Sequence, residues 1–165
     1  SAMRLAGNLH DLGKLAVPSE IIDKPGPLTT DEMNVMKRHP GLSGTILNSV
    51  PGLQRVAAWA SQHHEQLGGR GYPNGLEDRD IPLGSRIMAV ADIFTALRED
   101  RPYRAGMDNV QTFGIINDLS SRHALDAEVV SLARRHLPEL DHRRQAAQAQ
   151  AAVEFRQFYS DAVAV

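Results

Sequence analysis

An imidazole and a carboxylate are adjacent at His10-Asp11, and the ammonium group of Lys14 follows three residues later. Imidazoles bind transition metals, a carboxylate can bridge two metal ions, and an ammonium group can hold a phosphate. The pair alone is weak evidence, because His-Asp occurs by chance in many proteins. Further donors of the same types lie downstream, at His39, His63, His64 and Asp92. Together these nitrogen and oxygen donors are sufficient for a dinuclear metal centre.

Each histidine taken alone is more often a surface residue or a satisfied core residue than a metal ligand. Asp92 is different, because it falls within an otherwise apolar helical run. A buried carboxylate is costly unless it is paired or bound to a metal. The six residues considered together favour a metal site over six unrelated polar side chains.

A phosphodiester is a substrate type that suits such a centre, because it is anionic and resists attack by hydroxide. Two divalent ions held about 3.5–4 Å apart generate a bridging hydroxide and screen the phosphate oxygens. Asp11 is the natural bridge between the ions, and Lys14, Arg101 and Arg104 are candidate phosphate contacts. For the two arginines alone, surface solvation or helix capping explains the residues equally well.

Length and composition indicate one globular domain with an appendage, which we place at residues 1–140 and 141–165. The chain has no cysteine, which excludes disulfides, thiol catalysis and thiolate-bound metals. A formal net charge of −2 argues against a broad duplex nucleic-acid footprint. No stretch is apolar enough to span a membrane and no signal peptide is visible, so we expect a cytoplasmic protein.

Helical periodicity dominates the chain, and nothing alternates with a strand period, so the sequence predicts an all-α fold. Residues 66–82 are a long loop rich in Gly and Pro, and we expect Ile87, Val90, Ala91, Phe94 and Leu97 to form a buried stripe on the helix that follows. The predicted helices end near residue 10 and then cover residues 29–38, 40–50, 51–65, 83–98, 108–119, 126–137 and 142–160. Residues 29–32 form a capping-box pattern, and Asp108 and Asp126 are expected helix caps. The prolines between residues 18 and 27 mark a loop, and the apolar face expected on the helix over 51–65 consists of Leu53, Val56, Ala57 and Ala60.

Three segments resemble the HD-GYP family closely: HDLGKLAVPSEIIDKPGPLT, KRHPGLSG and HHEQLGGRGYPNGLEDRDIPLGSRIMAVADIFTALREDRPYR. The GYP triplet is Gly71-Tyr72-Pro73, and the resemblance runs from about Arg4 to Leu137. Members are bacterial cyclic di-GMP phosphodiesterases of the HD metallohydrolase superfamily. The resemblance implies a helical HD bundle that holds two or three divalent ions, iron or manganese, with zinc, nickel or magnesium in a purified sample. It also implies hydrolysis of cyclic di-GMP to the linear dinucleotide pGpG and on to GMP.

The resemblance also assigns roles to individual residues of this chain. Lys14 and Tyr72 match positions that contact substrate, as do Arg101 and Arg104, and Asp11 and Lys14 are the expected catalytic pair. Glu65 completes the HHE triplet, and we expect it to support the histidines. The positions that match the family's metal ligands are His10, Asp11, His39, His63, His64 and Asp92.

Two departures from the family pattern bear on activity. Gly68 stands where the family motif has Asp, which could loosen the GYP loop. Members also carry a metal-ligating His on a helix upstream of the HD pair, whereas this chain begins nine residues before His10. We therefore expect a fragment of a longer protein in which the first metal site is incomplete.

These departures leave three functions open. The first is a metal-dependent phosphodiesterase acting on cyclic di-GMP. The second is a catalytically impaired module that binds the cyclic dinucleotide, or docks on a GGDEF-domain protein through the GYP loop, for regulation. The third is an HD hydrolase of another cyclic dinucleotide. The family context implies an upstream sensor or receiver domain, and residues 142–160 are a candidate homodimer contact.

Overall fold

The chain divides into two compact units, Ser1–Val130 and Ser131–Val165, in the computed structural model, which describes residues 1–100 and 105–163. Within the described residues the regular elements are all helical, and the one β-type pairing is an isolated bridge between Gly68 and Glu77. The predicted all-α class is confirmed. No helix in the described part of the chain is long and apolar enough to cross a membrane.

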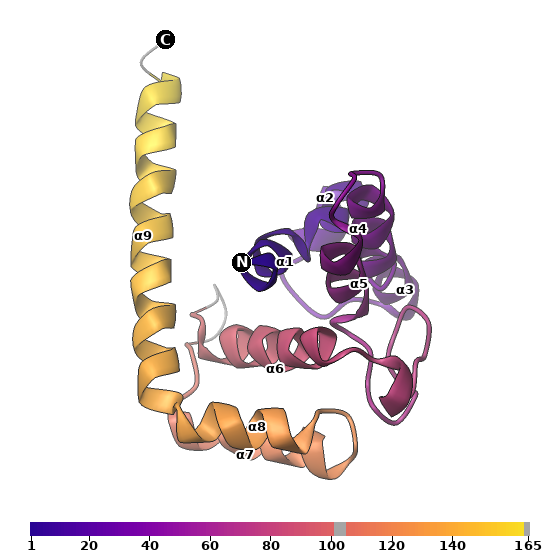
Figure 1. The fold of residues 1–165 in the computed structure, drawn as a ribbon. Helices are drawn as coiled ribbons and strands as arrows, with labels where there is room; N and C mark the ends of the chain where they lie inside the picture. The colour runs from indigo at the N-terminus through magenta and orange to yellow at the C-terminus, as the bar shows by residue number, and fades with distance from the viewer. Residues whose placement is uncertain (101–104, 164–165) are drawn as a thin grey trace. The chain divides into compact units, whose positions relative to one another are not determined.

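The longest connection between two α-helices runs from α5 to α6 and contains the 3-10 helix η2 (Figure 1). Their bounds are α1 (Ala2–Leu9), the 3-10 helix η1 (Leu12–Ala16), α2 (Ser19–Ile22), α3 (Thr30–Met36), α4 (His39–Asn48), α5 (Gln54–Gln62), the 3-10 helix η2 (Asp78–Asp80), α6 (Leu83–Arg98), α7 (Asn109–Ser121), α8 (Ala127–Arg135) and α9 (Leu137–Val163).

Side-chain caps begin several helices where the sequence predicts them. Thr29 and Glu32 form a reciprocal capping box at the start of α3, and Asp108 and Gln111 form another at α7. Asp126 accepts hydrogen bonds from two backbone N–H groups at the start of α8. These contacts satisfy backbone donors that the first turn of a helix leaves without partners. The N-termini of these helices can therefore be predicted from a few neighbouring residues.

The hydrophobic core beneath the site forms around α5, whose predicted apolar face is confirmed in the structure. Val56, Ala57 and Ala60 are buried and pack against Ala6 of α1, and the same cluster includes Leu47 of α4 and Met88 of α6. Helices α1, α4 and α6 all contact α5 (Figure 1). The alanines have no long side chain to hold these helices apart, so the helix ends that carry the polar site residues approach one another.

The predicted buried stripe of α6 is wrong at two positions. Ile87 and Ala91 are exposed, whereas Val90 and Phe94 are buried as expected. The structure also buries Ser85, whose hydroxyl donates to the side-chain oxygen of Gln62. Because α6 is contacted by both α5 and α7, its buried surface is set by two neighbours and not by one apolar stripe.

Three short or extended elements depart from the sequence prediction. Helix α2 lies in a segment predicted as loop, and η2 lies within the predicted loop 66–82. Helix α9 already begins at Leu137, before the predicted start at residue 142. Proline is tolerated in the first turn of a helix, where no intrahelical N–H bond is lost, so Pro138 does not prevent the earlier start.

Candidate metal centre

Helix ends place most of the six predicted ligands. His10 caps the C-terminus of α1, Asp11 precedes η1, and His39 is the first residue of α4. His63 caps the C-terminus of α5 and His64 follows it. At a helix end neighbouring residues are released from the 100° spacing of the helix, and the rings of His63 and His64 lie with centroids 3.9 Å apart. Asp92 alone comes from within a helix, α6.

Three histidines are oriented in the same way by the backbone. The Nδ1 atoms of His10, His39 and His63 each lie 2.7 Å from the carbonyl oxygen three residues earlier. A carbonyl only accepts, so Nδ1 carries the proton and donates, which leaves Nε2 as an acceptor with a free lone pair. Metal-ligating histidines are held in this way.

The acceptor atoms left over are buried without hydrogen-bond partners. His39 is 2% exposed and His63 is equally buried, and Nε2 of each has no hydrogen-bond partner among the described residues. Oδ1 of Asp11 is also buried without a hydrogen-bond partner among the described residues. It lies 3.3 Å from His39 Nε2, but the two atoms do not form a hydrogen bond. Orphaned buried acceptors cost free energy unless a ligand satisfies them. The donor set present therefore fits a metal ion.

The structure brings all six predicted ligands into one cluster. His10 Nε2 lies 3.4 Å from Asp11 Oδ2 and 3.7 Å from Asp92 Oδ1. Donor atoms within 4.8 Å of one another form two groups, each able to hold an ion, and the groups share His63: His39, His63 and His64, and His10, Asp11 and His63. This arrangement supports a centre with more than one ion, and the role of each residue as a ligand remains a prediction.

Electrostatics keep four of the donors, His63, His64, Asp11 and Asp92, in the protonation states that metals require, whereas the pKa of His10 is raised, mainly by its interaction with Asp92. Burial lowers the pKa of His63 to about 4, and burial together with the charge of His63 lowers the pKa of His64 to about 3. Both rings are therefore neutral at neutral pH. Burial alone would raise the pKa of Asp11, but His39 and Lys14 beside it more than offset this and hold the pKa well below its usual value. Burial also acts to raise the pKa of Asp92, but the interactions with His10 and the other nearby histidines outweigh it, so the pKa of Asp92 is lowered.

A buried hydroxyl holds the His-Asp turn against α4. Ser43 Oγ donates to the carbonyl of His10 at 2.6 Å and accepts from the backbone N–H of Gly13 at 2.8 Å. A side chain at Gly13 would overlap the carbonyl oxygen of His39, so only glycine permits this approach. Sequence reasoning missed Ser43, because a serine within a helix carries no local signal of a partner thirty residues away.

Lys14 lies at the edge of the cluster. Its Nζ is 2.6 Å from Asp11 Oδ2, and about two fifths of its side chain is exposed. The ammonium group thus faces both the predicted bridging carboxylate and solvent, where a phosphate could approach. Its predicted catalytic and substrate-binding roles remain predictions.

The structure gives Glu65 a different task from the predicted support of the histidines. Glu65 is 3% exposed, and its two carboxylate oxygens accept from the backbone N–H groups of Asn74, at 2.7 Å, and Leu76, at 2.9 Å. Gly71 packs so closely on the same segment that a Cβ there would overlap the backbone of Glu65 and Gln66. Glu65 therefore ties the GYP loop to the residue that follows the histidine pair.

The tied loop carries Tyr72 to the edge of the cluster. The Tyr72 ring lies with its centroid 4.8 Å from that of His64, and the Tyr72 N–H donates to the carbonyl of His64 at 3.2 Å. Burial, with smaller contributions from Asp92 and Asp11, raises the pKa of Tyr72 to about 12, so the phenol keeps its proton. Its predicted substrate contact remains a prediction.

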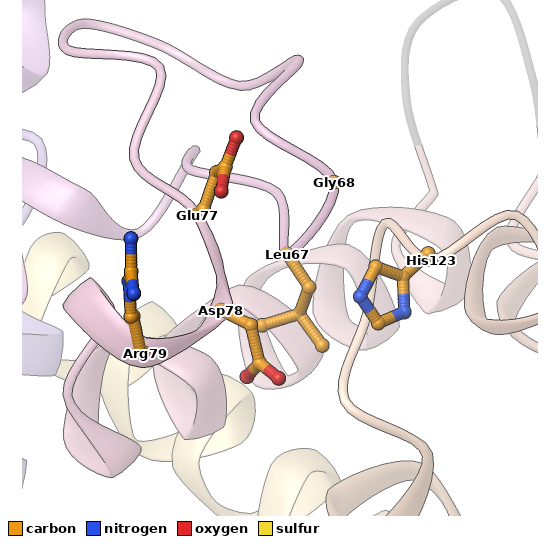
Figure 2. Close-up of a pocket in the computed structure, with 6 residues that line it drawn as sticks. All are labelled: Leu67, Gly68, Glu77, Asp78, Arg79 and His123. Carbon is orange, nitrogen blue, oxygen red and sulfur yellow. The ribbon is translucent and has the colours of Figure 1, made fainter.

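Gly68, the departure from the family motif, does not leave the loop unattached. Its N–H donates to the carbonyl of His123 at 2.8 Å, and the side chain of Arg70 donates to the carbonyl of Arg122 at the same distance. A cavity of about 390 Å³ adjoins this attachment, and its lining contains none of the predicted site residues (Figure 2). Arg101 and Arg104, the remaining predicted phosphate contacts, lie outside the described residues.

Comparison with known proteins agrees with this geometry. A family model described as the HD domain matches residues 1–129. The chain is 42% identical over 135 residues to 3′3′-cGAMP-specific phosphodiesterase 1 of Vibrio cholerae, covering 82% of this chain and 31% of that protein. It is 49% identical over 104 residues to the cyclic di-GMP phosphodiesterase response regulator RpfG of Xanthomonas campestris, covering 62% and 28%.

A third relative is a cyclic di-GMP phosphodiesterase of Thermotoga maritima, which is 41% identical over 122 residues, covering 73% of this chain and 33% of that protein. The chain thus spans about a third of the length of these curated relatives. The matched residues include the His-Asp pair, the histidine pair and the loop with Gly71-Tyr72-Pro73. The chain belongs to the HD domain family, in the HD-GYP group that its motifs resemble.

Proposed function

We propose that the chain is the phosphodiesterase domain of a longer protein and hydrolyses a cyclic dinucleotide, with cyclic di-GMP as the first candidate. The observation that carries the proposal is the set of buried acceptor atoms without partners, Nε2 of His39 and His63 and Oδ1 of Asp11. The names of relatives at 41–49% identity, which are phosphodiesterases of cyclic dinucleotides, support the substrate class.

In this proposal, the residues of the cluster hold two or three divalent ions, with iron or manganese as the physiological candidates. Zinc, nickel or magnesium are the alternatives in a purified sample. Bound divalent ions would polarise the scissile phosphate and activate a water molecule. The neutral rings of His63 and His64 and the ionised Asp11 and Asp92 need no proton loss before they bind.

The surrounding side chains act on the substrate directly. Lys14 offers its charge to a phosphate oxygen at the edge of the cluster, beside Asp11. The Tyr72 phenol remains protonated up to high pH, so it donates a hydrogen bond at neutral pH. Arg101 and Arg104 stay proposed as further phosphate contacts on the basis of the sequence resemblance.

The test combines metal analysis with product analysis on the same sample. Protein reconstituted with Fe(II) or Mn(II) without oxygen is assayed by mass spectrometry of the metal and by chromatography of the nucleotides. We expect more than one ion per chain and conversion of cyclic di-GMP to pGpG or GMP. Metal-loaded protein that binds the dinucleotide without product would identify the impaired regulatory module instead.

A second candidate substrate, 3′3′-cGAMP, is favoured by the name of the relative that matches 82% of this chain. Competition between equal concentrations of cyclic di-GMP and 3′3′-cGAMP measures the ratio of the two kcat/KM values directly. A ratio above one for cyclic di-GMP supports the first candidate, and a ratio below one supports 3′3′-cGAMP.

The wider partners remain part of the proposal. A GGDEF-domain protein would dock on the GYP loop, and residues 142–160, which lie within α9, would form a homodimer contact. An upstream sensor or receiver domain is supported by the relative whose name describes a response regulator. Sedimentation of the chain with and without residues 142–165 tests the dimer.

A further inference from the structure

We propose that Lys37 is a substrate-binding residue, and that its ammonium group binds the phosphate of the cyclic dinucleotide that is not being cleaved. The inference rests on the proposed function and deepens it. Lys37 is the first residue of the segment KRHPGLSG and lies two residues before the metal-ligand candidate His39, but the family resemblance assigns it no role. Its position in the structure, its charge and the chemistry of the substrate carry the argument.

The backbone at Lys37 is fixed from both sides. Lys37 caps the C-terminus of α3, and its N–H donates to the carbonyl of Met33 at 2.9 Å. Two residues later, His39 and Pro40 are buried in the first turn of α4. The Lys37 side chain itself is exposed. A rigid corner therefore presents a long, flexible cation to solvent beside the candidate metal centre.

The same corner lies against the GYP loop. The Lys37 ammonium is 5.4 Å from the centroid of the Tyr72 ring, and that ring lies 4.8 Å, centroid to centroid, from the His64 ring. A Cβ at Gly41 would lie 3.8 Å from Cγ of Pro73, so the first turn of α4 adjoins the loop as well. Tyr72 thus lies in contact with a ligand candidate and with Lys37, at the edge of the cluster.

The charge of Lys37 is available to a ligand. Lys14 is already 2.6 Å from Asp11, whereas Lys37 makes no ion pair within the described residues. A lysine is suited to this task, because its compact charge sits on a flexible stem and can follow a phosphate oxygen.

The substrate needs such a contact because a cyclic dinucleotide has two phosphodiester groups in one ring. Only one of them can occupy the metal centre during a cleavage event. The other is held outside the cluster and remains charged. An ammonium group above Tyr72, beyond the ligand histidines, is placed to neutralise that second phosphate.

The test compares Lys37→Gln with Arg38→Gln in the metal-loaded chain. Both residues are exposed neighbours and both substitutions remove one positive charge, so Arg38→Gln is the matched control. Calorimetric titration with a phosphorothioate analogue of cyclic di-GMP, chosen to be hydrolysed too slowly to be consumed during the titration, gives Kd at ionic strengths of about 0.01 M and about 0.15 M. We expect Lys37→Gln to raise Kd about fivefold at the lower ionic strength and less at the higher one, as expected for a charge-assisted contact. Arg38→Gln should stay within about twofold, and Lys37→Arg should retain most of the affinity.

Titration with GMP identifies which phosphate Lys37 binds, because GMP has a single phosphate that the metal centre takes. The Kd for GMP should be the same for the wild type and Lys37→Gln. Three results would each overturn the inference. The first is an equal rise in Kd for Lys37→Gln and Arg38→Gln, and the second is a rise in the Kd for GMP as large as that for the dinucleotide. The third is a rise in Kd that does not depend on ionic strength. Hydrolysis is followed separately: a wild-type chain that binds cyclic di-GMP but does not cleave it contradicts the proposed function and leaves the comparison of Kd values intact.

Discussion

Polar acceptors are buried without partners in the candidate metal centre, whereas large apolar side chains are exposed along helix α9. His39 Nε2 and His63 Nε2 have no hydrogen-bond partner within the described residues. In α9, Phe155 is 63% exposed and Phe158 is 71% exposed. Both arrangements cost free energy in an isolated chain, but the cost has a different meaning in the two regions.

The cost at the cluster is specific. A buried acceptor without a partner costs about 1–3 kcal/mol, and several of them converge on the same small volume. Only a ligand of defined chemistry can satisfy all of them together. The exposed rings of α9 lie together, with the centroids of Phe155 and Tyr159 4.9 Å apart, and any apolar surface could cover them. The charges of α9 pair within the helix, as with Arg143 and Glu139 at 2.7 Å. The comparison therefore supports the proposed metal chemistry at the cluster and carries no argument for chemistry at α9.

Removing one ligand atom from the cluster should have the largest effect. In His39→Asn the amide N–H replaces the Nδ1 donor to the Met36 carbonyl, while the Nε2 ligand is lost. We expect the metal content to fall and hydrolysis of cyclic di-GMP to drop more than about 100-fold. The exposed His123 supplies the control, His123→Asn, which should keep its metal. Full activity in His39→Asn would remove this residue from the ligand set.

Changing the carboxylate that ties the GYP loop should have the next largest effect. Glu65→Gln turns one of two acceptors into a donor that faces a backbone N–H, so the chain should lose about 1–3 kcal/mol of unfolding free energy. We expect kcat/KM to fall about tenfold because Tyr72 is no longer held, with the metal content unchanged. Chemical denaturation, metal analysis and steady-state kinetics measure the three quantities. The exposed loop residue Glu77, changed to Gln, should alter none of them.

Acidification should lower the unfolding free energy of the metal-free protein through the histidines of the cluster, with a smaller effect than the two substitutions above. The pKa values of His63 and His64 are lowered from 6.5 to about 4 and about 3. A lowered pKa means that the folded chain resists protonation, so the stability is complete above pH 6.5 and declines as the pH falls towards 4. His10, whose pKa is raised mainly by Asp92, opposes part of this loss, because its contribution grows as the pH falls. Urea denaturation at intervals between pH 7 and pH 4 measures how the unfolding free energy changes with pH. An unfolding free energy that does not change over this range would contradict the prediction.

The smallest effect should come from α9. Phe158→Ala removes an exposed ring, so the unfolding free energy should change by less than about 0.5 kcal/mol and the rate of hydrolysis should stay the same. Sedimentation of the variant would detect any contribution of this side chain to the proposed homodimer. A large loss of activity in Phe158→Ala would show that the two regions are not functionally separate.

Local signals in the sequence predicted the helices better than they predicted the geometry of the loops. The capping boxes at Thr29 and Asp108 and the apolar face of α5 are legible because their partners lie within one or two helical turns. The exposed Ile87 and Ala91 were misassigned, because burial on α6 depends on two packed helices that the periodicity of one helix cannot report. The boundary between the predicted domains 1–140 and 141–165 stays a prediction.

The sequence by itself determined the chemistry available to this protein: six nitrogen and oxygen donors, no thiol, and motifs of the HD-GYP family. Residue types and spacing carry that information, since ligand chemistry belongs to the side chain. Only the tertiary structure decided that Glu65 holds the GYP loop, that Ser43 holds the His-Asp turn, and that Lys37 lies beside Tyr72. The contacts of Ser43 and Lys37 join segments distant in sequence, and those of Glu65 cross a loop that has no regular periodicity, so local patterns in the sequence report none of them.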